Sequence, residues 1–130
     1  TRVGPGPMEY YKGPASANGI CFRGSKLYCS SWGEHDIFEV DMSGRKEARS
    51  VGLASKFKGL DAIEALPDGS FLVSDQPTSR IVWVSADFTK TEKLAEVHQP
   101  ADFGIDLKRG RIYAPTFFDN TVTVFSLKRK

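Results

Sequence analysis

The stretch SANGICFRGSKLYCSSWGEHDIFEV, residues 16–40, contains three short apolar segments separated by turn-forming residues. The segments are rich in Ile, Phe, Tyr and Val, which favour strands, and Gly-Ser and Gly-Glu lie between them. This pattern predicts a small antiparallel sheet. Whether the sheet stands alone depends on whether the pattern recurs in the rest of the chain.

The pattern does recur, and it recurs twice. The sequence ANGICFRGSKLYCSSWGEHDIFEVD aligns with LDAIEALPDGSFLVSDQPTSRIVWVS and with ADFGIDLKRGRIYAPTFFDNTVTVFS. The three copies begin at Asn18, Asp61 and Asp102, so the step is roughly 40–45 residues. The first two copies continue into a fourth, more polar strand, predicted at 45–51 and 90–97.

Four strands in roughly 40–45 residues is the period of a β-propeller blade. We therefore predict an all-β fold of three propeller blades, which is half of a six-bladed β-propeller. The third blade lacks its outer strand, because the sequence after its third strand is too short. The expected division is an N-terminal lead at 1–14 and blades at 15–57, 58–98 and 99–130.

Three blades leave two open edges, because propellers close with about four to eight blades. The third copy misses a strand, whereas PMEYYK at 7–12 has no blade of its own. We expect a strand around residues 8–11 to complete a neighbouring blade, so that two chains form a closed homodimer by strand exchange. The alternative is that the chain is half of a longer six-bladed protein.

Composition narrows the class of partner. The net charge is +2 in 130 residues, with 26% charged and 40% apolar residues. This balance is ordinary for a globular domain and does not favour nucleic acid. The chain has no apolar run of 18 residues, so no membrane span is expected, and the compartment stays undecided. Cys21 and Cys29 are expected to be small buried residues, and a disulfide between them is the alternative. With His35 and His98 they match no zinc spacing.

The repeats resemble the senescence marker protein/gluconolactonase family of regucalcin-like six-bladed propellers, and VSDQPTSRIVWV is similar to NHL-type repeats. The resemblance covers residues 15–127 and corresponds to the C-terminal half of such a protein. It implies calcium or another divalent cation at the channel mouth, with hydrolysis of sugar lactones or binding of a small polar ligand. Asn18 matches the family's Asn-Gly, and Asp61 its next aspartate, although Ala62 replaces the usual glycine. The family's ligating glutamate lies in a blade that this chain lacks.

The residues support the same site independently. First strands of blades line the channel, so Asn18, Asp61 and Asp102 are expected on one ring. Their oxygens suit a hard cation, and neighbouring carboxylates raise each other's pKa, which could prepare Asp61 as a general base. The alternative is that these residues only form turns with their own backbone.

Four further residues are candidate ligand contacts, and each has a structural alternative. The aromatic side chains could line a pocket or pack between blades, His98 could be an ordinary loop residue, and Glu64 reaches the ring only if its strand is irregular. They are Trp32, Glu64, His98 and Phe117. The function hypotheses are a cation-dependent lactone hydrolase or small-ligand binder, a non-enzymatic scaffold for protein or glycan, and a half-propeller without independent activity.

Overall fold

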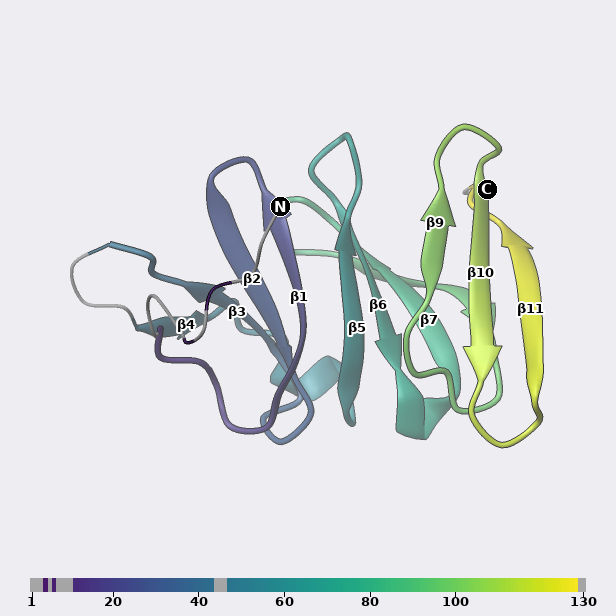
Figure 1. Ribbon diagram of the computed structural model, residues 1–130, viewed down its shortest axis with the longest axis horizontal. Helices are drawn as coiled ribbons and strands as arrows, with labels where there is room; N and C mark the ends of the chain where they lie inside the picture. The colour runs from purple at the N-terminus through teal and green to yellow at the C-terminus, as the bar shows by residue number, and fades with distance from the viewer. Residues whose placement is uncertain (1–3, 5, 7–10, 44–46, 129–130) are drawn as a thin grey trace.

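The computed structural model describes residues 4, 6, 11–43 and 47–128. Three antiparallel sheets follow one another along the chain, and two short 3-10 turns are the only helical segments among these residues (Figure 1).

The first sheet has the order β1 (Ala17–Arg23), β2 (Lys26–Ser31), β3 (Ile37–Val40) and β4 (Ala48–Ser50). The second has the order β5 (Leu60–Ala65), β6 (Phe71–Asp75), β7 (Arg80–Val84) and β8 (Thr91–Glu96). The third contains β9 (Gly104–Asp106), β10 (Arg111–Thr116) and β11 (Thr121–Ser126). The 3-10 turns are η1 (Ala54–Lys56) and η2 (Gln76–Thr78).

The sheets are arranged like successive propeller blades, with the first strand of each blade on the inner side. β1 packs directly against β5, and their backbones come very close at Gly19. A Cβ atom added at Gly19 would lie 2.6 Å from the carbonyl oxygen of Asp61. Only glycine fits at this point, so the Asn-Gly of the first copy is a packing requirement as well as a turn signal.

Two apolar cores join the blades in pairs. The first lies between blades 1 and 2 and contains Tyr28, Ile37, Ile63 and Phe71 among its buried residues. The second lies between blades 2 and 3 and includes Leu72, Ile81, Phe103 and Ile112. The middle blade therefore buries both of its faces, because alternate side chains of one strand point to opposite sides of the sheet.

Two buried serines, which we call the inter-blade serines, tie each blade to the next. Ser30 Oγ donates a hydrogen bond to the carbonyl of Asp61 (2.5 Å) and accepts one from the amide of Gly19 (2.9 Å). Ser74 Oγ repeats this arrangement one blade later, donating to the carbonyl of Ala101 (2.5 Å) and accepting from the amide of Ala62 (2.9 Å). Each hydroxyl thus satisfies two inner strands at once, since a serine hydroxyl can both donate and accept.

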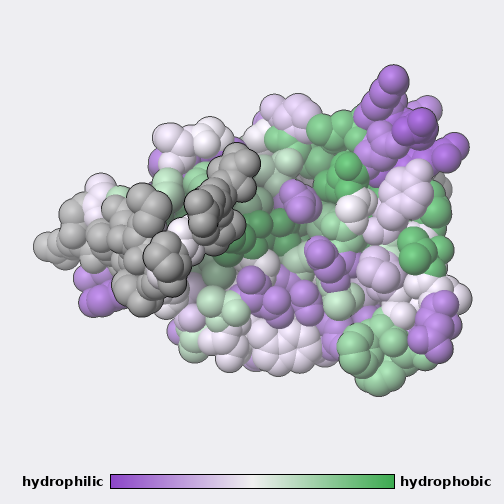
Figure 2. Space-filling view, viewed as in Figure 1, coloured by the Kyte–Doolittle hydropathy of each residue, from purple (hydrophilic) through white to green (hydrophobic). Residues whose placement is uncertain are grey.

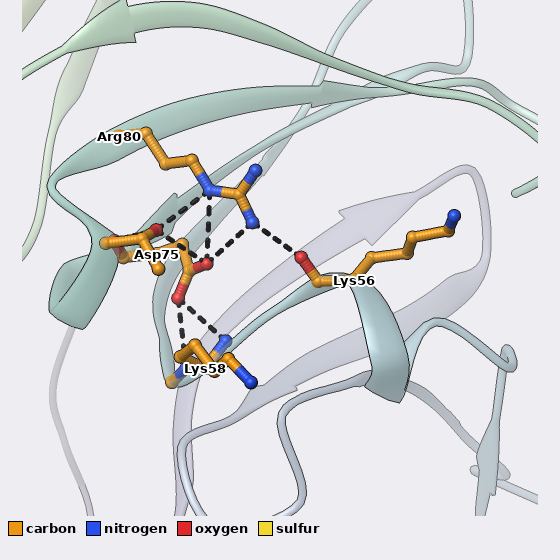
Figure 3. A network of polar contacts seen from close by, with 6 residues as sticks. Lys56, Lys58, Asp75 and Arg80 are labelled. Atoms are coloured by element: carbon orange, nitrogen blue, oxygen red, sulfur yellow. Dashed lines mark hydrogen bonds and ion pairs between the residues drawn. The ribbon is translucent and has the colours of Figure 1, made fainter.

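A buried carboxylate holds the turn that precedes the second blade. Asp75 is fully buried, and its Oδ1 accepts hydrogen bonds from the amides of Lys58 (3.1 Å) and Gly59 (3.0 Å). Its Oδ2 lies 3.0 Å from Nη2 of Arg80, which also donates to the carbonyl of Lys56 (Figure 3). Asp75 and Arg80 therefore brace the hairpin between β6 and β7.

The all-β fold of three blades is confirmed. Of the predicted outer strand at 45–51, residues 45 and 46 lie outside the described part, and β4 covers Ala48–Ser50 of the rest. β8 is shorter than the predicted 90–97, and the third sheet has three strands within the described residues. The strand expected around 8–11 falls mostly on residues outside the described part. No helix in the described chain is long and apolar enough to cross a membrane.

The two cysteines are buried free thiols, as the sequence predicts. Cys21 is paired with Tyr28 and Cys29 with Ile20, so the two cysteines are diagonal neighbours in the ladder and not partners. Burial raises the pKa of the Cys21 thiol to about 12 and also raises that of Cys29. Neither thiol is therefore prepared for nucleophilic chemistry.

Candidate functional site

Asn18 and Asp61 occupy equivalent irregularities at the beginning of the inner strands. The β1–β2 ladder shifts register between Ala17 and Ile20, and the β5–β6 ladder does so between Leu60 and Ile63. A bulge redirects the side chains that it contains. Both candidate residues are therefore turned out of the regular alternation by the same local feature, in two successive blades.

Asp102 stands one residue beyond the position that repetition assigns to it. The bridge between Pro100 and Thr116 sets the register of the third blade, and Ala101 takes the place of Asp61 as acceptor of the inter-blade serine. Ala101 is therefore the structural counterpart of Asn18 and Asp61. The sequence alignment assigns Asp102 to the position of Asn18 and Asp61 because the alignment matches polar residues. It contains no information on how the strands pair.

The charge of Asp102 nevertheless reaches the other candidate carboxyls. Burial and then the nearby Asp102 raise the pKa of Asp61, while a hydrogen bond from Asn18 lowers it. Burial and Asp102 also raise the pKa of Glu64, so this residue joins the same electrostatic neighbourhood. The four residues form what we call the inner acidic group: Asn18, Asp61, Glu64 and Asp102.

The inner acidic group matches a hard cation in chemistry but not in number. Carboxylate and amide oxygens are the donors that calcium takes, and it takes about six to eight of them. Within the described ranges, no three His, Cys, Asp or Glu side chains are close enough together to hold a metal ion. A cation at this group would need further ligands from backbone, water or a neighbouring blade.

The two aromatic candidates lie in the hairpins that connect the second and third strands of their blades. Trp32 is 37% exposed and lies over Gly59, where an added Cβ would meet its ring at 3.2 Å. Phe117 is 70% exposed and meets Phe118 edge to face at 4.9 Å. Phe117 therefore does not pack between blades within this chain.

His98 lies in the loop before the third blade, as expected. Its Nδ1 is 2.9 Å from Oδ2 of Asp119, and its ring is 6.4 Å from that of Phe118. The sequence did not single out Asp119 or Phe118 as partners of His98, because they come from a different hairpin. The structure thus gathers His98, Asp119 and the two phenylalanines into one exposed cluster.

The sequence analysis also missed the inter-blade serines. Their signal was present, since Ser30 and Ser74 fall at the same position of the repeat, followed by Pro115 in the third copy. A buried serine that recurs in an apolar strand indicates a repeated hydrogen bond.

In the inner acidic group, Asn18 and Asp102 are exposed, whereas Asp61 and Glu64 are half-buried. A hollow of about 620 Å³ is found elsewhere, along the outer strands β3 and β4, where it is lined by Glu39, Asp41 and residues 47–50. The group would become enclosed only if other blades completed the ring around it.

Comparison with known proteins supports the fold. No family model matches the chain, and no curated protein matches it. Among solved structures, a chain of the crystal structure of the nidogen/laminin complex is similar, with a TM-score of 0.68 and 19% identity over 83% of this chain. A streptogramin B lyase structure is similar with a TM-score of 0.57 and 16% identity over 89% of this chain.

Both of these structures are propeller proteins, and the matched part is 42% of each of their chains. At these identities the likeness concerns the fold and does not single out the gluconolactonase family. The chain therefore spans less than half of the propellers it matches, and it has the fold of three consecutive blades of a β-propeller.

Proposed function

We propose that the inner acidic group binds a small polar ligand, together with calcium or another divalent cation, at the mouth of a propeller channel. The observation that carries the proposal is the position of Asp61. Its half-buried carboxyl is hydrogen-bonded by Asn18 and lies in the field of Asp102. Asn18 and Asp61 also hold equivalent places in successive blades, which supports the proposal because the first strands of propeller blades line the channel.

The chemistry of the group supports a sugar lactone as the ligand class. Asp61 has a raised pKa, so near neutral pH its carboxyl is a stronger base than an ordinary aspartate. It would accept a proton from a water molecule that attacks a lactone carbonyl, and it would return this proton to the ring oxygen as the ring C–O bond breaks. The Asn18 amide would hold Asp61 in orientation, and Glu64 and Asp102 would accept hydrogen bonds from sugar hydroxyls. A bound divalent cation would supply polarisation of the lactone carbonyl.

The direct test is a thermal unfolding series with calcium chloride alone, followed by isothermal titration. We expect calcium to raise the melting temperature of the wild-type chain, because a ligand that binds only the folded state stabilises it. Asp61→Asn and Asn18→Ala should remove the shift. Glu96→Gln is the matched control, since Glu96 is an exposed carboxylate of the outer strand β8, paired with Lys93.

A melting temperature that does not respond to calcium would contradict the proposed binding of a cation. An assay of sugar-lactone hydrolysis tests the proposed enzymatic activity separately. Activity that survives Asp61→Asn unchanged would exclude Asp61 as the base. A wild-type chain that binds neither calcium nor a sugar lactone would contradict the proposal as a whole.

A second function, a non-enzymatic scaffold for protein or glycan, is favoured by one observation. Phe117 and Phe118 are 70% and 59% exposed at the tip of the β10–β11 hairpin. Exposed aromatic side chains are common in recognition surfaces, because they bury a large apolar area at low entropic cost. Binding of a protein or glycan that is lost in Phe117→Ala and kept in Asp61→Asn would support the scaffold.

A further inference from the structure

The first blade exposes apolar side chains whose counterparts in the other two blades are buried or partly buried. Ile20 is 62% exposed and Phe22 is 60% exposed on β1. By ladder register, Ile20 corresponds to Ile63 in the second blade and Phe103 in the third, which are 2% and 4% exposed. We call this side of the first blade, with Ile20 and Phe22, the leading face.

The third blade shows the same exposure on its opposite side. Val122 and Val124 of β11 are 62% and 48% exposed, opposite Pro115 and Tyr113 in the ladder. The counterpart of Val122 in the second blade is Ile81, which is fully buried in the second core. We call this side of the third blade, with Val122 and Val124, the trailing face. Figure 2 shows hydrophobic residues at the surface on the end of the molecule where β11 lies.

Inside the chain, a neighbouring blade covers the positions that are equivalent to these two faces. Ile63 lies in the core formed with blade 1, and Phe103 lies in the core formed with blade 2. Ile81, the counterpart of Val122, is covered by blade 3. The leading and trailing faces are therefore two halves of a blade–blade interface that the chain has already formed twice.

We propose that the trailing face of one chain packs on the leading face of a second copy, and that two copies close a six-bladed ring. A contact between two different faces generates either a closed ring or an open filament. Six blades lie within the range of about four to eight in which propellers close. This chain matches 42% of each of two propeller chains, so two copies supply blades for about one such ring.

The contact between copies differs from the internal interfaces in one respect. Pro115 occupies the position of the inter-blade serines Ser30 and Ser74, opposite Val122. A proline has no hydroxyl, so nothing at this position can donate to the carbonyl of Asn18 in the second copy, the counterpart of Asp61. The contact therefore rests on apolar packing and is weaker than the two internal interfaces.

The experiment is sedimentation velocity of the full chain over a range of concentrations, in buffer with EDTA. The chelator separates this proposal from cation binding, which can fail without changing the assembly. We expect a reversible species with the mass of two chains. A monomer up to about 100 µM, where even a dissociation constant of about 200 µM would give a detectable dimer, overturns the proposal. So does a series of larger oligomers.

Two variants locate the contact, and a third serves as their control. Phe22→Glu and Val122→Glu should each give monomers, because either one buries an unpaired charge in the contact. Lys90→Glu places an acidic charge on an exposed residue between β7 and β8 of the middle blade, which forms neither face, and it should leave the dimer intact. Both monomeric variants should unfold cooperatively like the wild type, which distinguishes lost association from lost folding.

A fourth variant tests the head-to-tail geometry because it should strengthen the association between copies. Pro115→Ser restores the hydroxyl that the two internal interfaces possess. Because the ring contains two identical contacts between copies, it should tighten the dissociation constant of the dimer about thirtyfold, the equivalent of two net hydrogen bonds of about 1 kcal/mol each. In the proposed register, the new serine donates to the Asn18 carbonyl of the second copy. The tighter dissociation constant should therefore disappear in the Phe22→Glu background. Weaker association of Pro115→Ser would overturn the proposed register between the copies.

Discussion

The second and third blades have the same strand pattern but opposite exposure. Three of the five residues of β7 in the second blade are buried and none is exposed, whereas five of the six residues of its counterpart β11 in the third blade are exposed. Both strands are rich in β-branched and aromatic residues. The difference comes from the neighbours, because the second blade has a blade on each side and the third has one on a single side. Burial in a repeat protein is thus a property of the position in the array as much as of the residue.

The largest expected effect is a difference in the free energy of unfolding between alanine variants of Ile63 and of its counterpart Ile20. Ile63→Ala should lower the free energy of unfolding by about 2–5 kcal/mol, because it leaves a cavity in the first core. Ile20→Ala should cost under about 1 kcal/mol in the monomer, since Ile20 is exposed there. Urea denaturation of the dilute chain measures both. Equal costs would contradict the view that the neighbouring blade determines burial.

The next prediction compares the stability cost of breaking a buried ion pair in the second blade with that of breaking an exposed ion pair in the third. Asp75→Ala should cost about 3 kcal/mol, because it leaves Arg80 and two backbone amides without their acceptor. Asp106→Ala removes the exposed pair with Arg109 and should cost under about 1 kcal/mol. The same denaturation series measures both variants. A small cost for Asp75→Ala would show that the hairpin forms without its brace.

A smaller effect concerns the hydrogen bond that joins the second and third blades. Ser74→Ala should cost about 1–2 kcal/mol, because it leaves the amide of Ala62 and the carbonyl of Ala101 unpaired in a buried place. Ser126→Ala on the exposed strand β11 is the control and should change stability by under about 0.5 kcal/mol. Hydrogen exchange at Ala62 provides a local readout. Unchanged protection there would mean that the serine does not hold the inner strands together.

The smallest effect is a pH dependence from the inner acidic group. A carboxyl whose pKa is raised on folding binds its proton more tightly in the folded chain. The resulting stability is present at low pH and is lost as the pH rises from the ordinary values of 3.8 for Asp61 and 4.5 for Glu64 through the raised values. Asp61→Asn should therefore gain under about 1 kcal/mol over the wild type at pH 7 and nothing at pH 3.

Asp87 provides the opposite sign as a control for this pH series. Hydrogen bonds from Thr89 and Ser85 lower the pKa of the exposed Asp87 to about 2. The folded state therefore favours its ionised form, and this contribution is lost as the pH falls from 3.8 through about 2. Asp87→Asn should be less stable than the wild type at pH 7. A gain for Asp61→Asn that persists at pH 3 would contradict an electrostatic origin.

Much of the fold could be predicted from the repeat, because strand periodicity and turn residues are local signals. The alignment correctly found blades in 16–40 and in the two copies that follow. It failed at Asp102, where one residue fewer separates the second and third blades than polar matching suggested. A shift of one residue reverses the face of a side chain, and only the pairing with β10 determines the register.

The candidate site was predictable in part for the same reason. Asn18 and Asp61 were identified because they begin equivalent strands, and the structure places both in equivalent bulges. Asp119 as a partner of His98 could not be predicted, since the two residues belong to separate segments that meet only after folding. Lactone chemistry and cation binding remain predictions that the proposed experiments address.

The sequence by itself determined that this protein is a β-repeat of three blades, since alternating apolar residues and glycine turns act over short distances. The tertiary structure alone decided which strand faces are buried and which stay open. It also decided that Ser30 and Ser74 connect inner strands, and that Ala101 takes the place expected for Asp102. These facts depend on contacts between segments far apart in the chain, and no local pattern of residues encodes the register at which distant strands meet.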